Sequence, residues 1–335
     1  MLKIHANIDE IDKKQWRKLI ETSPVPSFFQ TQECYDFYCS LSFLEPFVFG
    51  VSENEQLTGV ICGYVIAEGG KFKRYFSRRA IILGGALLAV NITDSALTKL
   101  LDFTVKTLKN RAIYIEFRNY NSYSDNKEIF KNAGFKYMPH LNFHVPTENP
   151  QAAFAQLSST KRHDVKISQN QGAKIVEITT ENDLQNYYKI LIRLYLTKIK
   201  TPLFPYEFFE KIVKLPECKI FGIKFEGKII GGSICVFLAQ KSVYEWFVCG
   251  QDGRFKNIYP STLSTWAAID YAAQNGFRYF DMMGAGKPDR KNGIREFKAK
   301  FGGKLVEHGR FLYLCNNFLY KIGKFYVEKI MKSLK

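Results

Sequence analysis

The sequence predicts an α/β fold made of two tandem copies of one mixed-sheet unit. Its 335 residues suit two domains of about 150 residues each. Each half contains two apolar segments joined by a short polar turn, at 46–67 and at 219–238. A strand, a helix and a second strand follow in each half, and the second strand reads YIEFRN in one half and YFDMMG in the other. This repeated order predicts a duplicated unit in which antiparallel strands come first and a crossover helix comes later.

The first half, residues 1–150, is expected to form the N-terminal domain. Apolar residues at helical or alternating spacing define its elements, and Gly, Pro, Asn and Ser mark the turns. A basic loop with interleaved aromatic residues, 71–79, fits either a solvated hairpin loop or a nucleic-acid or lipid-headgroup surface. The expected elements are strand 2–6, helices 12–21 and 32–41, strands 46–51, 57–67 and 80–83, helix 94–109, strand 112–118, helix 126–133 and strand 135–145.

The second half, residues 151–335, is expected to form the C-terminal domain. Its most regular part is 244–303, which reads as strand, basic loop, helix, strand, glycine turn and short basic helix. The amphipathic basic tail 318–335 fits a packed terminal helix or a helix on a membrane surface. The other expected elements are helices 152–157 and about 161–171, strand 174–178, helix 182–197, strands 219–224 and 228–238, and a closing strand within 302–314.

The net charge of +16 fits either a solvated basic surface or a polyanionic partner, such as a nucleotide diphosphate, coenzyme A, RNA or an anionic membrane. The N-terminus is charged and has no apolar signal segment, and no apolar run reaches the roughly 18 residues of a membrane-spanning helix. A cytoplasmic protein is therefore expected, with contact to the inner membrane surface as an open addition. The seven cysteines are scattered, which predicts reduced thiols, and the five histidines have no ligand spacing, so no metal is expected.

Five stretches spread over most of the chain carry a family resemblance. They are SFFQTQECYDFY, RAIILGGALL, LSSTKRHDVKISQNQGAKIV, GQDGRFKNIYPSTLSTWAAIDYAAQNGFRYFDMMG and GIREFKAKFGG. Together and in this order they resemble the FemABX peptidyltransferases, whose two halves are each similar to the GNAT acyltransferase fold. The chain departs from the family pattern at its Gly-Gly-Pro turn, which reads Gly84-Gly85-Ala86 here, and at Cys34 and Tyr38.

The resemblance implies two tandem domains of the acyl-CoA N-acyltransferase type and the transfer of an acyl group to an amine. In FemABX enzymes the donor is an aminoacyl-tRNA and the acceptor is a peptidoglycan precursor, whereas relatives of the same fold use an acyl-CoA. The donor would be a co-substrate, and no cofactor is expected. The expected acceptor is an anionic nucleotide-sugar or lipid-linked precursor.

Acyl transfer to an amine needs a deprotonated amine, donors for the developing oxyanion, and two substrates held together. No G-x-S-x-G elbow exists, so a direct attack on the ester or thioester is the simpler mechanism. The resemblance places the Phe297-Lys298 pair near the reacting ester, although Lys298 also fits a solvated lysine of a basic helix. Asp281 ends a strand before a glycine turn, where it would position or deprotonate the amine, or cap the turn.

The remaining candidates are substrate-binding residues. Glu116 and Arg118 lie two apart on one strand, which fits either a substrate contact or an ion pair. Arg254 and Lys256 precede a helix where GNAT enzymes hold a pyrophosphate, but the glycines of that pattern are missing. Basic residues at a helix start oppose its dipole, which suggests a ligand phosphate at Lys161 and Arg162, although a solvated helix start fits them better. Trp246, on the strand 244–248, completes the set.

Three functions remain open from the sequence. The first is an aminoacyl or acyl transferase that acts on an amine of a cell-envelope or sugar-nucleotide precursor. The second is an acyl-CoA-dependent N-acyltransferase that acts on an amino sugar or a small amine. The third is a non-catalytic nucleic-acid or membrane-binding protein on an acyltransferase fold.

Overall fold

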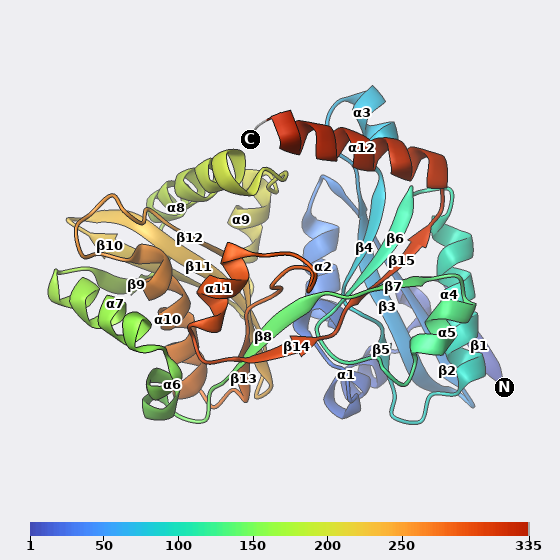
Figure 1. Ribbon diagram of the computed structural model, residues 1–335. Coiled ribbons are helices and arrows are strands. Elements are labelled where there is room, and N and C mark those ends of the chain that lie inside the picture. Colours follow the sequence, from blue (N-terminus) through green and yellow to red (C-terminus); the bar gives the residue numbers. More distant parts are fainter. Residues whose placement is uncertain (334–335) are drawn as a thin grey trace. The chain divides into compact units, whose positions relative to one another are not determined.

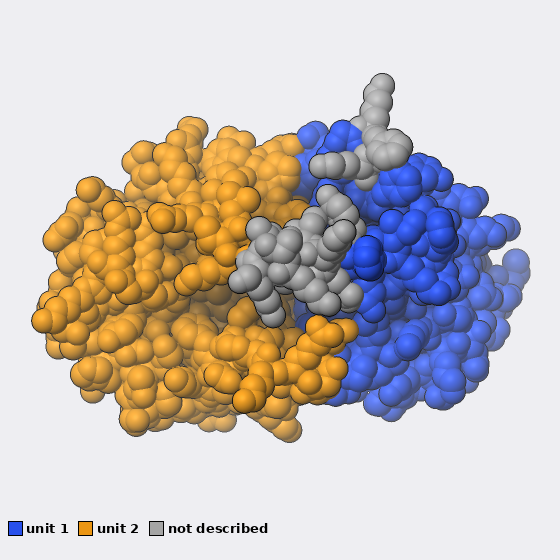
Figure 2. Space-filling model, turned by 45° about the horizontal axis from the view of Figure 1, so that its top comes forward, with its two compact units in different colours: residues 1–140, 307–335 blue, residues 141–306 orange. Residues whose placement is uncertain are grey.

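The structure is a computed structural model that describes residues 1–333, and their side chains apart from those of 71–73 and 326–333 (Figure 1). The chain forms two compact units. Unit 1 contains Met1–His140 and Glu307–Lys335, and unit 2 contains Leu141–Val306; Figure 2 colours them separately. The last two residues of the expected terminal helix, 334 and 335, lie outside the described residues. Both units have the mixed α/β fold that the sequence predicts.

Unit 1 is built on a sheet of eight strands within the described residues, in the order β1-β2-β3-β4-β6-β15-β7, with β5 paired to β3. All neighbours are antiparallel except β4 and β6, which run parallel. The strands are β1 (Leu2–His5), β2 (Leu44–Glu53), β3 (Gln56–Ile66), β4 (Arg79–Gly84), β5 (Leu87–Leu88), β6 (Tyr114–Asn119), β7 (Lys136–Met138) and β15 (Arg310–Leu314).

The helix α4 (Asp94–Leu108) makes the crossover between the parallel strands β4 and β6. Thr93 caps its first turn by accepting from the Ala96 N–H, and Leu97, Leu100 and Leu101 are buried in the core of unit 1. Where the sequence suggested a loop at 71–79, the structure has a helix, α3. The other helices of the unit are α1 (Lys13–Thr22), α2 (Gln32–Ser40), α3 (Lys71–Ser77), α5 (Lys127–Asn132) and α12 (Asn317–Ser333), with short 3-10 helices at Ile8–Glu10 and Phe28–Gln30.

Two stretches of the family resemblance meet inside unit 1. The Gln30 amide donates to the carbonyls of Gly84 (3.1 Å) and Gly85 (3.2 Å), and it also lies 3.3 Å from the Tyr123 hydroxyl. Gly84 has a φ of 82°, and a Cβ there would lie 2.0 Å from the Ser27 hydroxyl. Only glycine fits this turn, which explains why the phenylalanine–glutamine segment and the glycine pair occur together.

Unit 2 repeats this arrangement with a seven-stranded sheet, counted over the described residues, in the order β14-β8-β13-β12-β11-β10-β9. Its parallel pair is β12 and β13, joined by the crossover helix α10. The strands are β8 (Leu141–Pro146), β9 (Lys174–Glu177), β10 (Cys218–Phe225), β11 (Lys228–Leu238), β12 (Ser242–Gly250), β13 (Tyr279–Asp281) and β14 (Lys304–Glu307). The helices are α6 (Pro150–Gln156), α7 (Ser159–Asn170), α8 (Glu181–Leu194), α9 (Tyr206–Ile212), α10 (Pro260–Gln274) and α11 (Gly293–Ala299), with a π-helical turn at Tyr195–Ile199.

The chain passes from one unit to the other between residues 140 and 141 and returns between 306 and 307. The segment 135–145, expected to be one closing strand, forms β7 in the sheet of unit 1 and β8 in the sheet of unit 2. In the same way β14 pairs in unit 2, while β15 inserts between β6 and β7 of unit 1. The compact units therefore differ from the expected division into 1–150 and 151–335, because residues 307–335 belong with the first unit.

Candidate active site

A network of buried polar groups surrounds the end of β13 in unit 2. Asp281 is fully buried, and its Oδ1 accepts from the Asn142 side-chain amide and from the Met283 N–H, both at 2.7 Å. Its Oδ2 lies 3.1 Å from Nε2 of His144, whose ring stacks on Tyr279 with centroids 4.5 Å apart. Three protein groups therefore hold this carboxylate, and the geometry favours a positioning role over removal of a substrate proton.

The turn after Asp281 is held in an uncommon conformation. Met283 has a φ of 52° and Gly284 a φ of 103°. The Oδ1 atom of Asn142 accepts from the Gly284 N–H at 2.8 Å and from the Phe143 N–H at the same distance. Because Asp281 and Asn142 fix the N–H groups of this turn, its carbonyl groups have defined directions.

Lys298 lies against these carbonyls. Asn292 caps α11 by accepting from the Ile294 N–H, and the helix then carries Lys298 into the interior of the unit. The Lys298 ammonium donates to the carbonyls of Met282 and, at 2.8 Å, Gly284. Two of its three N–H groups are used in this way, so the ammonium is fixed in position while one donor remains.

Glu245, on β12, is a second buried charged group of this site. Thr265 of α10 donates to its Oε1 at 2.8 Å. Burial raises the pKa of Glu245, and the attraction of the Lys298 ammonium and the Thr265 hydrogen bond only partly oppose this, so that the pKa is about 7. Burial lowers the pKa of Lys298, against the attraction of Glu245 and Asp281. The charge on Lys298 therefore lowers the pKa of Glu245, and the charge on Glu245 raises the pKa of Lys298.

Lys161 belongs to the same unit but not to its surface. It is buried, and its ammonium donates to Thr262 Oγ1 of α10 (2.6 Å) and to Asp164 Oδ2 (3.1 Å). It also lies 4.6 Å from the centre of the Phe297 ring, in a cation–π contact. Lys161 thus joins α7 to α10 and α11, and Phe297, the neighbour of Lys298, packs on it.

The other candidates of unit 2 lie in different environments. Arg162 donates to the carbonyls of Ala155 and Leu157, so it completes the turn between α6 and α7. Arg254 and Lys256 are on the loop before α10, and Arg254 donates to the Gln251 side chain at 3.1 Å. Trp246 packs edge-on against Phe208 of α9, with ring centres 5.1 Å apart. It thus contacts α9, whereas its neighbour Glu245 contacts α10.

The start of α10 is already in contact with an anion of the protein. The Asp252 carboxylate accepts from the Ser261 N–H at 3.2 Å and from the Ser261 hydroxyl. A Cβ on Gly250 would lie 2.4 Å from the Ser261 nitrogen, so strand and helix approach closely here. At the helix start where a GNAT enzyme would hold a pyrophosphate, the Ser261 N–H therefore already donates to the Asp252 carboxylate.

Glu116 and Arg118 belong to unit 1, where they form an ion-pair cluster. The Glu116 carboxylate accepts from the Arg118 Nε and from Arg310 of β15, both at 2.8 Å. Burial raises the pKa of Glu116, but the attraction of the two guanidinium groups outweighs it and lowers the pKa to about 2. This cluster ties β15 to β6.

Sequence reasoning missed Asn142, His144 and Glu245. Asn142 and His144 come from β8, which is expected in the other domain on the basis of chain order. Glu245 reads as one polar residue of an apolar strand. A charged residue inside the otherwise apolar stretch VYEWFV was the one available signal.

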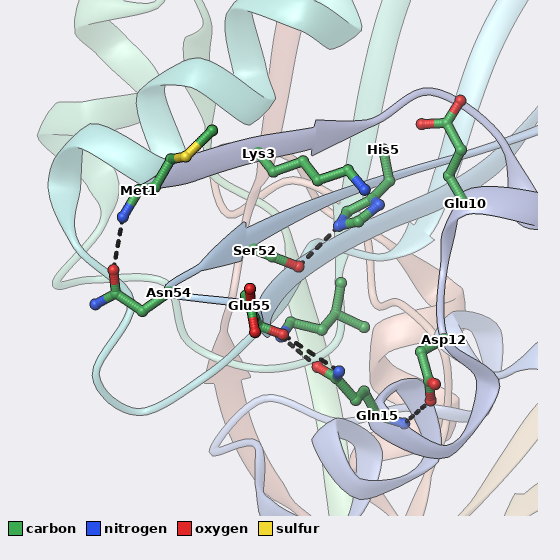
Figure 3. A pocket seen from close by; sticks show the side chains of 10 residues that line it. Met1, Lys3, His5, Glu10, Asp12, Gln15, Ser52, Asn54 and Glu55 are labelled. Carbon is green, nitrogen blue, oxygen red and sulfur yellow. Dashed lines mark hydrogen bonds between the residues drawn. The ribbon is translucent and has the colours of Figure 1, made fainter.

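A cavity of about 640 Å³ lies in unit 1 and shares no residue with this network (Figure 3). Lys3, His5, Glu10 and Asp12 are among its lining residues. The His5 Nε2 lies 2.7 Å from the Ser52 hydroxyl, and the Met1 amine donates to Asn54 at 2.6 Å.

No helix among the described residues has the length and apolar character needed to cross a membrane.

Comparisons with known proteins identify the relatives of this arrangement. Residues 222–328 match the model of the FemAB family. The chain is similar to the crystal structure of FemX, with a TM-score of 0.72, 14% identity, and coverage of 96% of this chain and 99% of that chain. No match is found among curated proteins.

Two further solved structures share the fold. L-PGS from Bacillus licheniformis has a TM-score of 0.56 and 14% identity, with 91% of this chain and 92% of that chain covered. A tandem GNAT protein from the clavulanic acid biosynthesis pathway has a TM-score of 0.58 and 11% identity, with 94% and 99% covered. At such identities these are likenesses of fold, and the family match covers residues 222–328. The chain therefore shares the fold of FemX and of a tandem GNAT protein, and its residues 222–328 match the FemAB family.

Proposed function

We propose that the protein transfers an aminoacyl group from an aminoacyl-tRNA to an amine of a cell-envelope precursor. The observation that carries this proposal is the buried Lys298 ammonium, held on the carbonyls of Met282 and Gly284 within the segment that matches the FemAB family. An ammonium fixed by two acceptors offers its remaining N–H to an ester oxygen in a defined direction.

The reaction is a direct substitution at the ester carbon. The acceptor amine nitrogen forms a bond to the acyl carbon, and the bond from that carbon to the ribose oxygen of the tRNA breaks. The amine loses a proton and the ribose oxygen gains one, so the step is balanced without a cofactor. In this mechanism Lys298 stabilises the developing oxyanion, Asp281 positions the turn that holds it, and Phe297 borders the site.

The donor is the point at which the two candidate enzymes differ. An acyl-CoA would need a pyrophosphate site at the start of α10, where Asp252 accepts from Ser261 and would repel a phosphate. The net charge of +16 suits a polyanionic donor such as tRNA. For the acceptor, we propose an anionic nucleotide-sugar or lipid-linked precursor, used in the cytoplasm at the inner membrane surface.

A donor screen tests this function. The purified chain is incubated with a set of radiolabelled aminoacyl-tRNAs, and separately with acyl-CoAs, together with nucleotide-sugar peptides, lipid-linked precursors and small amines. We expect label to pass from at least one charged tRNA to a cell-envelope precursor, and no transfer from any acyl-CoA. Transfer from acyl-CoA alone would overturn the proposed donor, and no transfer from either class would overturn the enzymatic function.

A further inference from the structure

The helices α3 and α12 of unit 1 contact each other (Figure 1). On α12, Phe318, Ile322 and Phe325 are 72%, 44% and 67% exposed. They are spaced by four and three residues, so they form one stripe along the helix. The neighbouring helix α3 has two exposed aromatic residues, Tyr75 and Phe76.

This exposed stripe is separate from the face of α12 that packs on its own unit. The inward face carries Leu319 and Tyr320, which are half-buried, and the Tyr320 ring contacts Tyr114 of β6 with centres 5.5 Å apart. The Leu319 N–H donates to the Asn316 side chain, which caps the start of the helix. Because packing already uses the inward face, the three exposed apolar residues add nothing to the core of the unit.

Basic residues accompany the apolar stripe. Lys321 and Lys324 of α12 and Arg74 of α3 are exposed, and the Arg78 guanidinium lies 4.7 Å from the centre of the Tyr75 ring. Over its whole length α3 has three basic residues and no acidic one, while α12 has four basic residues and one acidic one. An apolar stripe flanked by ammonium groups matches the boundary between acyl chains and anionic headgroups of a membrane.

We propose that the α3–α12 surface binds the enzyme to an anionic membrane, with Phe318, Ile322 and Phe325 inserted among the lipids. The basic flank also suits RNA, but the aliphatic Ile322 at the centre of the stripe offers no ring on which a base could stack. A lipid surface uses all three apolar residues and the lysines at once. This inference extends the proposed function without depending on catalysis, because lipid binding is measured without either substrate.

The test is co-sedimentation of the full chain with vesicles of phosphatidylcholine alone or mixed with phosphatidylglycerol. We expect binding to the anionic vesicles that weakens with salt, and little binding to phosphatidylcholine alone. The variant Phe318→Ser/Phe325→Ser should lose about tenfold or more in affinity, and Lys321→Glu/Lys324→Glu should lose the preference for anionic lipid. Matched controls on other exposed positions of unit 1, Val90→Ser and Lys99→Glu/Lys106→Glu, should bind as the wild type does.

Three outcomes would overturn the proposal. The first is a wild-type chain that does not bind anionic vesicles. The second is an equal loss in the control variants, which would indicate a general effect of charge or apolarity. The third is a Phe318→Ser/Phe325→Ser variant that retains vesicle binding and loses binding of uncharged tRNA, which would make this surface an RNA site.

Discussion

The ammonium of Lys298 lies 2.8 Å from the carbonyl oxygen of Gly284, although the two residues are 14 positions apart in the chain. The glycine belongs to the turn after β13 and the lysine to α11. Asn142, from β8, accepts from the N–H of the same glycine. The turn after β13 is therefore hydrogen-bonded both to β8, the first strand of unit 2, and to the helix α11.

Replacing Lys298 with alanine should abolish most of the activity. The substitution removes the fixed N–H donor, and loss of one such donor at a reacting carbonyl costs about 100-fold or more in kcat. The measurement is the rate of aminoacyl transfer with the donor identified by the screen. The matched control is Lys300→Ala, an exposed lysine of the same basic segment, which should keep wild-type turnover. Equal turnover in both variants would rule out the role of Lys298.

Asp281→Asn should lower kcat while leaving KM for the donor nearly unchanged. The asparagine Oδ1 still accepts from Asn142 and the Met283 N–H, but the negative charge is lost and an amide NH2 group replaces Oδ2 beside His144 Nε2, so the network that fixes the turn holding Lys298 is weakened. Weakening of this buried network should also destabilise unit 2 by about 1–3 kcal/mol. Steady-state kinetics and urea unfolding measure the two effects. An unchanged kcat in a variant that is destabilised would show that Asp281 serves the fold alone.

Relative to the wild type, the Glu245→Gln variant should become more stable as the pH rises from about 4.5 to about 7. The pKa of Glu245 is higher in the folded chain than in the unfolded chain, so the folded state binds more protons and the wild type loses stability across this range. The glutamine removes that loss, which amounts to at most about 3 kcal/mol. Urea unfolding at pH 5 and pH 8 checks the difference, with Glu296→Gln as the exposed control. A difference between variants that does not change with pH would contradict the raised pKa.

The Glu116 cluster should make unit 1 sensitive to acid. The pKa of Glu116 is about 2 in the folded chain, below its ordinary value of 4.5, so the folded state binds fewer protons and stability falls as the pH drops through this range. The ionised carboxylate contributes about 3 kcal/mol at neutral pH. Glu116→Gln should weaken the acid dependence of unfolding, whereas Glu128→Gln, in an exposed pair with Lys131, should leave it unchanged. The same acid dependence in both variants would count against the cluster.

Local residue patterns were enough to predict the repeated architecture. Periodicity and turn residues predict the strand pairs β2–β3 and β10–β11 and the crossover helices α4 and α10. They also predict the strand that follows each crossover helix, β6 in unit 1 and β13 in unit 2. These signals act within about 20 residues, where backbone preferences and burial of one face determine the structure. The Phe297-Lys298 pair was singled out by the family resemblance, because the local pattern of a basic helix after a glycine turn also fits a solvated lysine.

The tertiary structure alone decided which residues meet. The segment 135–145 reads as one strand, yet it is divided between two sheets, and this division brings Asn142 and His144 to Asp281. Lys161 and Arg162 resemble phosphate ligands at a helix start, but in the structure both donate hydrogen bonds to groups of unit 2. The sequence determined the elements, whereas the tertiary structure brought Asn142 and His144 to the buried Asp281. Such contacts join residues more than 100 positions apart, and their free energy depends on desolvation in the folded core, which no local pattern contains.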